Sequence, residues 1–159
     1  MKLAICGRGR AGKDEAAKWF NENTTVRYSG FSTSAVITPY AAKRLGISEE
    51  EAFRRRHEDR MLWYKIGNEL REHDPAFLAR QTFERGDIAV GIRDANEMQA
   101  VLDEELIDLA IWIERDVPPD PTLTYGPEFC DVIVLNTGEI EAMYARLEAL
   151  SKAMGIFVA

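Results

Sequence analysis

The sequence predicts a three-layer α/β/α fold built on a five-stranded, mainly parallel sheet. Two observations predict it: five short segments are strand-like and four of them are almost wholly apolar, and stretches with helical periodicity separate most of the five. Strands without polar alternation are buried on both faces, as in a parallel sheet covered by helices on each side. Ligands of such a sheet bind beyond the carboxyl ends of its strands.

The five expected strands differ in how they are recognised. The first, residues 3–6, is an apolar run that ends in glycines, whereas residues 24–29 are β-branched and aromatic. The other three are apolar runs over residues 87–92, 109–113 and 131–135. Residues 115–128 hold four prolines and Gly126, so we expect a long loop there.

Apolar periodicity and capping residues define the expected helices. Ser48 is an N-cap with glutamate three positions later, and a charged amphipathic helix is expected from it to about Glu72. Asp74 and Pro75 begin a further helix that ends near Arg85. The remaining helices are expected over residues 13–23, 96–105 and 139–154.

Size and charge narrow the functional classes. The chain has 159 residues, which suits a single domain, and its net charge is -7. An acidic chain argues against general nucleic-acid binding, which needs clustered Lys and Arg. No run approaches the roughly 18 apolar residues of a membrane span, and no signal-peptide core is present, so we expect a cytoplasmic protein without a membrane partner. A homodimer is compatible with the sequence.

The sharpest motif is Gly7-Arg8-Gly9-Arg10-Ala11-Gly12-Lys13-Asp14, which fits G-x-x-x-x-G-K between an expected strand and an expected helix. Glycines let the backbone wrap closely around phosphates, and successive N–H groups with the helix N-terminus point at the anion. We therefore expect a nucleoside triphosphate to bind Gly7, Gly9, Arg10, Ala11, Gly12, Lys13, Asp14 and Glu15, with Lys13 reaching the β- and γ-phosphates.

Asp14 stands where Ser or Thr usually ligates Mg²⁺ in this motif. It either holds Mg²⁺ through water or caps the helix. Glu15 either adds charge near the metal or is an ordinary acid in the first helical turn, and the second reading is favoured.

A second group of candidate binding residues contains positively charged side chains. Arg60, Tyr64, Gly67 and Arg71 recur at spacings of three and four, so they share one helical face. The guanidinium fork suits phosphate recognition, but the same face could be solvated and paired with Glu58, Asp59, Glu69 and Glu72.

Two further arginines follow strands. Arg93 lies at the ligand end of the sheet, or it forms an ordinary ion pair with Glu97. Arg115 either supplies charge to a transferring phosphoryl group or is a surface arginine. Ser29 ends the second expected strand.

In four segments the sequence resembles the bacteriophage-type deoxynucleoside monophosphate kinases of the P-loop nucleoside monophosphate kinase-like group. They are GRGRAGKDEAAKWF, RMLWYKIGNELREHDPAFLARQ, GIRDANEMQAV and FCDVIVLNTGEIEAMYARL, in the family's order. The resemblance implies a P-loop NTPase fold, ATP and Mg²⁺ as cofactors, a helical acceptor-binding insertion at about residues 31–85, and a lid loop at about residues 115–128. Two departures are Val90-Gly91-Ile92, where the family often has acids, and Arg115 as the one basic residue of the lid.

The function that the resemblance implies is ATP-dependent phosphoryl transfer to a small-molecule acceptor, a (deoxy)nucleoside monophosphate, with Lys13 and Arg115 catalytic. On this resemblance the expected substrate-binding residues are Ser29, Arg60, Tyr64, Arg71, Arg93 and Glu97. One alternative is a kinase of another phosphorylated molecule, such as dephospho-coenzyme A. The other is a nucleotide-binding regulator that transfers nothing.

Overall fold

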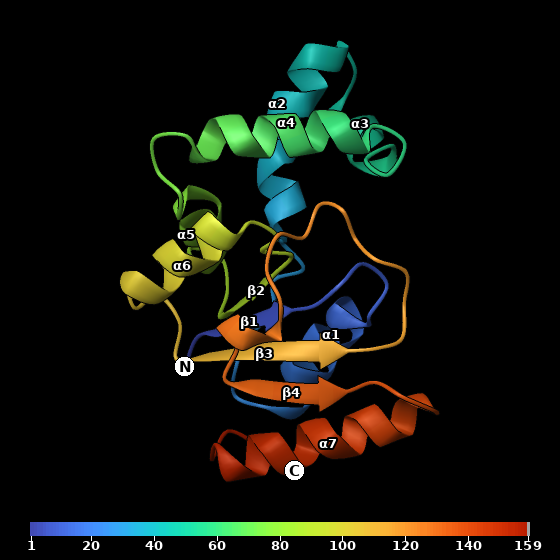
Figure 1. The fold of residues 1–159 in the computed structure, drawn as a ribbon, viewed down its shortest axis with the longest axis vertical. Coiled ribbons are helices and arrows are strands. Elements are labelled where there is room, and N and C mark those ends of the chain that lie inside the picture. Colours follow the sequence, from blue (N-terminus) through green and yellow to red (C-terminus); the bar gives the residue numbers. More distant parts are fainter. Residues whose placement is uncertain (159) are drawn as a thin grey trace.

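A parallel sheet of four strands lies at the centre of the computed structural model, which describes residues 1–158 (Figure 1). The strands are β1 (Leu3–Cys6), β2 (Ile88–Val90), β3 (Leu109–Glu114) and β4 (Val132–Leu135). Their order in the sheet is β2-β1-β3-β4. Leu3 is in register with Ile88 on one side and Leu109 on the other, so the glycine-rich loop leaves a strand that is flanked on both edges.

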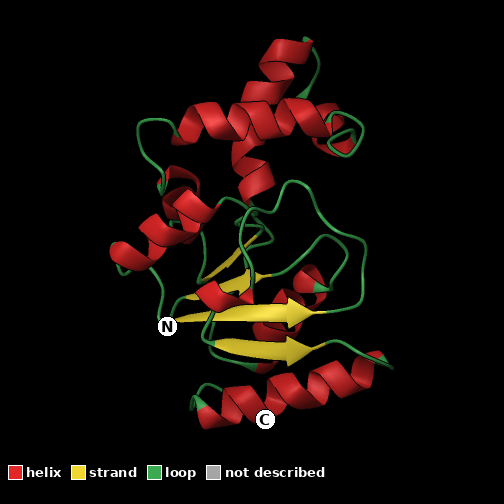
Figure 2. Cartoon of the chain, viewed as in Figure 1, coloured by secondary structure: helices red, strands yellow, loops and turns green. Residues whose placement is uncertain are grey.

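The helix predicted over residues 13–23 has these bounds, and those predicted over residues 74–85, 96–105 and 139–154 are present with ends that differ by one to three residues (Figure 2). A further helix, residues 33–45, lies within the segment expected to be a helical insertion. The α-helices are α1 (Lys13–Asn23), α2 (Thr33–Leu45), α3 (Glu49–Arg54), α4 (Arg60–Arg71), α5 (Phe77–Phe83), α6 (Ala95–Asp103) and α7 (Ile140–Ala153). A 3-10 turn, η1 (Pro127–Phe129), precedes β4. Among residues 1–158, none of the helices has both the length and the apolar composition needed to span a bilayer.

Helices pack on both faces of the sheet because successive strand side chains point to opposite faces. Leu3 and Ile5 of β1 pack in one core with side chains of α1 and α7. Ala4 and Cys6 pack in a second core with side chains of α5 and α6. Every residue of β1 is buried, as predicted from its continuous apolar run.

The predicted strand over residues 24–29 is wrong, and the sheet has four strands rather than five. This segment runs beside β2, where the Asp87 amide donates to the Arg27 carbonyl at 2.8 Å. Its own amides are used elsewhere: Arg27 N–H donates to the Asp87 carboxylate and Tyr28 N–H to the side chain of Asn21, both at 2.9 Å. Because side chains take these N–H groups, no ladder forms.

The single helix predicted from Ser48 to Glu72 is also wrong, because it divides into α3 and α4. Ser48 is the N-cap, as expected, and its Oγ accepts from the Glu51 amide at 3.1 Å. Only Ala52 of α3 is buried, so little apolar burial extends that helix. Arg56 then folds back over the Phe53 ring and donates to the Phe53 carbonyl, which closes the turn between the two helices.

A third apolar cluster holds the helices of residues 33–83 together on the side of the sheet where β2 forms its edge (Figure 1). Ile37 of α2, Trp63 and Ile66 of α4, and Leu78 of α5 are buried in it. This separate core positions α4 so that the face that carries Arg60 lies near the glycine-rich loop.

Candidate functional site

The glycine-rich loop joins the carboxyl end of β1 to the first turn of α1, as its sequence predicts. Gly7 and Gly12 have φ angles of 145° and 100°, and Arg10 has a φ of 66°. A Cβ on Gly7 would lie 2.6 Å from the Ile113 carbonyl oxygen, and one on Gly12 would lie 2.5 Å from Nδ2 of Asn136. Both positions therefore require glycine, for backbone conformation and for space.

Asn136 supports this loop from the end of β4. It is buried, and its Nδ2 donates to the Ala11 carbonyl at 2.8 Å. Glu114, at the end of β3, accepts from Arg8 at 3.1 Å and from the Trp112 indole at 2.6 Å. The carboxyl ends of two neighbouring strands thus fix both sides of the loop.

The Lys13 side chain is only 8% exposed, and its Nζ donates to the Arg8 carbonyl at 2.7 Å. Burial first, and then the nearby positive charge of Arg93, lower the pKa of Lys13 from 10.5 to about 8. The ammonium is therefore held inside the loop in a place that disfavours its charge, and an anion brought there would relieve that cost.

Asp14 and Glu15 lie in the first turn of α1. The N-cap is Gly12, and no side chain caps this helix, so the capping alternative for Asp14 is wrong. Asp14 is exposed, and Oδ1 accepts a long bond of 3.5 Å from the Tyr28 hydroxyl. Glu15 accepts from the Tyr144 hydroxyl of α7, which agrees with the favoured structural reading.

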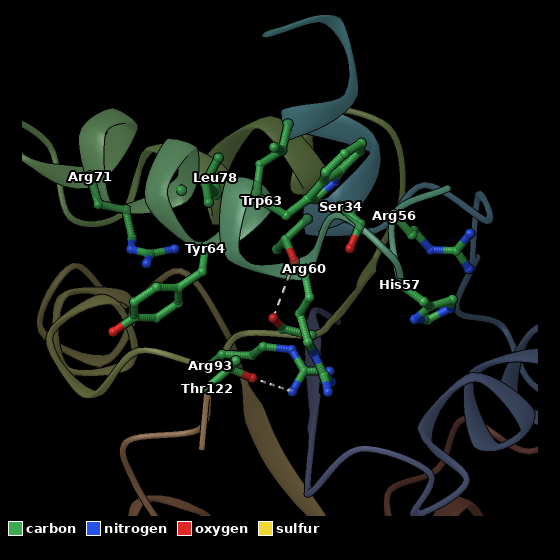
Figure 3. A pocket seen from close by; sticks show the side chains of 14 residues that line it. Ser34, Arg56, His57, Arg60, Trp63, Tyr64, Arg71, Leu78, Arg93 and Thr122 are labelled. Atoms are coloured by element: carbon green, nitrogen blue, oxygen red, sulfur yellow. Dashed lines mark hydrogen bonds between the residues drawn. The ribbon is translucent and has the colours of Figure 1, made fainter. Parts of the chain in front are cut away.

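Opposite the loop, α4 presents the face predicted from residue spacing. Arg60, Tyr64, Gly67 and Arg71 all line one cavity between α4, α2 and the carboxyl edge of the sheet. Figure 3 shows Arg60, Arg93 and Thr122 at the end of this cavity nearest the sheet. Its lining side chains include four arginines and His57, and none of the fourteen lining residues is acidic. Such a lining can hold an anion, although Arg71 and Arg93 are each paired with a carboxylate just outside it.

Arg60 connects this cavity to the glycine-rich loop. It also lines a second hollow with Gly9, Arg10 and Asp120. A Cβ on Gly9 would lie 3.7 Å from an Arg60 guanidinium nitrogen and 3.1 Å from Asp120 Oδ2. The glycine-rich loop and the arginine-lined cavity are therefore adjacent, with Arg60 between them.

The expected ion pair between Arg93 and Glu97 is wrong, because each has another partner. Glu97 is 1% exposed and pairs with Arg71 at 3.4 Å. Burial raises the pKa of Glu97 to about 7 against the attraction of Arg71, and Oε1 has no hydrogen-bond partner among residues 1–158. Arg93 pairs instead with Asp120 of the proline-rich loop.

Ser29 and Arg115 lie apart from this arrangement. Ser29 is exposed, is not among the residues that line the cavity, and accepts from the Phe31 amide at 3.1 Å. Arg115 is exposed at the start of the proline-rich loop, and within residues 1–158 it forms no ion pair or side-chain hydrogen bond.

The residues of the site that sequence reasoning missed include Asp120, Thr122 and Asn136. Asn136 carried a signal, since Asn-x-Gly directly follows a predicted strand. Asp120 stands between two prolines, a pattern typical of a surface turn, and nothing local in the sequence places it against the loop at residues 7–13.

The residues near the loop can hold Mg²⁺ through a single carboxylate, together with phosphate oxygens and water. Among residues 1–158, no group of three or more His, Cys, Asp or Glu side chains is placed to hold a metal. Mg²⁺ is commonly held by one or two carboxylates together with phosphate oxygens and water. Asp14, exposed at the first turn of α1, can supply one such carboxylate.

Comparison with protein-family models gives no match for this chain, and comparison with curated proteins gives none either.

Proposed function

We propose that this chain is a P-loop kinase that transfers the γ-phosphoryl group of ATP to a (deoxy)nucleoside monophosphate. The observation that carries the proposal is the pairing of two features: a glycine-rich loop on a central parallel strand and an arginine-lined cavity adjacent to it. The loop alone would suit any triphosphate-binding protein. The cavity adds a place for a second phosphorylated molecule.

On the triphosphate side, Lys13 is the central group. Its ammonium would exchange the Arg8 carbonyl for a phosphate oxygen, and the polyphosphate's negative charge would keep it protonated. The first amides of α1 have no intrahelical partner and point along the helix axis toward the same place. Phosphoryl transfer needs positioning and neutralisation of charge more than covalent chemistry, and these groups supply both.

On the acceptor side, Arg60 and Arg93 lie where a monophosphate would meet the loop, and Arg71 lies farther along α4. Tyr64 is half-buried beside them and offers a ring face on which a base can stack. Trp63, by contrast, is buried in the helical core. Arg115 is exposed on the proline-rich loop and could approach the transferring group when that loop moves.

Mg²⁺, when bound, would neutralise charge on the phosphate oxygens, and Asp14 is the residue of this chain that would help to hold it.

The test is a transfer assay with ATP and Mg²⁺ across the nucleoside and deoxynucleoside monophosphates, with dephospho-coenzyme A as an additional acceptor. The proposal predicts equal amounts of ADP and one nucleoside diphosphate. Formation of coenzyme A would assign the other kinase activity. ATP binding with slow hydrolysis and no transfer to any acceptor would assign a nucleotide-binding regulator. The exposed Arg115, the lid's one cation, is the observation that favours the regulator.

A further inference from the structure

Asp120 places a carboxylate inside the cationic site. Its side chain is only 3% exposed. Oδ2 accepts from the Gly9 amide at 3.0 Å and from the Arg93 guanidinium. Oδ1 accepts from the Thr122 hydroxyl at 2.6 Å and from the Thr122 amide at 3.0 Å. Both oxygens are thus fully engaged by donors, two of which belong to the candidate phosphate sites.

This carboxylate is an anion at every pH at which the protein would work. Burial opposes its charge, but the Thr122 hydrogen bonds and Arg93 together hold the pKa of Asp120 well below its usual range. A loop amide and a guanidinium are the donors that also recognise phosphoryl oxygens. Asp120 therefore uses the same donors that a phosphoryl group would use.

The contacts that anchor the two ends of the surrounding loop do not involve Asp120. At one end, Glu114 is held by Arg8 and Trp112. At the other end, the Thr124 amide donates to the Arg93 carbonyl at 2.9 Å, and the Tyr125 hydroxyl donates to the Ile92 carbonyl at 2.6 Å. Within the described chain, residues 115–119 between these anchors make no side-chain hydrogen bond or ion pair with other residues.

We infer that Asp120 stands in for a phosphoryl group of the ligand, and that a phosphorylated ligand must displace it from Gly9 and Arg93 to bind. The vacated donors, with Arg60 beside them, then form a subsite for a phosphate monoester or for the terminal group of a polyphosphate. Asp120 competes with the ligand and lowers its apparent affinity, which makes it a determinant of binding strength at the proposed active site. This inference rests on the proposed function, because it assumes that the loop and cavity bind phosphates.

The experiment compares binding of ATP and of inorganic phosphate to wild type, Asp120→Asn and Asp116→Asn by isothermal titration calorimetry. Asp120→Asn keeps the side-chain shape and removes the competing charge. Asp116→Asn removes the same charge from an exposed position on the same loop and is the matched control. If the closed contact is populated about nine-tenths of the time, its loss strengthens binding about tenfold.

The expected result is about tenfold tighter binding of both ligands to Asp120→Asn, with Asp116→Asn unchanged. Equal or weaker binding by a folded Asp120→Asn, when wild type binds ATP, overturns the inference and leaves the proposed function standing. Failure of wild type and both variants to bind either ligand overturns both.

A second measurement needs no variant. A crystal of the wild-type protein soaked in inorganic phosphate should show phosphate against the Gly9 amide and Arg93, with Asp120 moved away. Phosphate bound elsewhere in the site, with Asp120 still on Gly9, overturns the inference.

Discussion

Replacement of Lys13 by methionine separates the chemistry of the loop from the stability of the fold. Methionine is nearly as long as lysine and fills the same buried space without the charge. The pKa of Lys13 falls from 10.5 to about 8, which corresponds to about 3 kcal/mol against the buried ammonium. Removal of the charge recovers that cost but gives up the hydrogen bond to Arg8, worth about 1.5–3 kcal/mol. We therefore expect Lys13→Met to unfold at the same temperature as wild type or at a higher one.

Although Lys13→Met should be at least as stable as wild type, its rate of phosphoryl transfer should be much lower. Loss of one preorganised donor to a developing negative charge costs about 10²- to 10³-fold in kcat, and a charged donor belongs at the upper end of that range. The assay is steady-state transfer from ATP to the best acceptor, with thermal unfolding measured on the same samples. Lys18→Met, on the exposed side of α1, is the matched control and should keep full activity.

Two outcomes would refute this reasoning. Full activity in Lys13→Met would remove the lysine from the chemistry. A large loss of thermal stability would show that its contact with Arg8 holds the loop together.

Three further perturbations have distinct expected results. Because Lys13 must be protonated to hold a triphosphate, ATP affinity measured by calorimetry should fall about tenfold per pH unit above pH 8, and a constant affinity to pH 9.5 would contradict this. Arg60→Met should raise the KM for the acceptor about tenfold or more and the KM for ATP by less, whereas Arg44→Met, on an exposed ion pair, should change neither KM. Glu97 has a folded pKa of about 7 against 4.5 unfolded, so the folded state binds the extra proton and wild-type stability should fall as pH rises between these values, by about 3 kcal/mol. In Glu97→Gln, the free energy of unfolding measured with urea should not show this decrease with pH. An identical pH dependence in both proteins would contradict the raised pKa of Glu97.

The loop at residues 7–13 could be predicted from the sequence because its parts are contiguous. A strand, two obligatory glycines, a lysine and a helix start within a few residues leave little freedom in their arrangement. The α4 face was predictable for a related reason. Arg60, Tyr64 and Arg71 follow helical spacing, so any helix there places them on one side.

The errors concern interactions between distant residues. Residues 24–29 have the composition of a strand, but Asn21 and Asp87 take the amides that a ladder would use.

The bounds of α2 were not predicted for a local reason. Pro39 lies within this helix, and proline inside a helix usually breaks the pattern by which helices are recognised.

The ion-pair partners of Arg93 and Glu97 could not be predicted from the sequence either. Arg93 has Glu97 four positions away, which made a local pair reasonable, yet Asp120 is its partner across 27 positions. Glu97 is buried under α4 and pairs with Arg71 instead. Such pairs depend on how the helices and the proline-rich loop pack over the sheet, and local spacing carries no information about that packing.

The central claim is that the loop holds a polyphosphate directly beside a cavity for a phosphorylated acceptor. A crystal structure of the complex with a non-hydrolysable ATP analogue, Mg²⁺ and a deoxynucleoside monophosphate tests it most directly. We predict β- and γ-phosphates on the amides of residues 9–14 and on Lys13 Nζ, with the acceptor phosphate against Arg60 and Arg93. A triphosphate bound elsewhere, with Lys13 still on the Arg8 carbonyl, would contradict it.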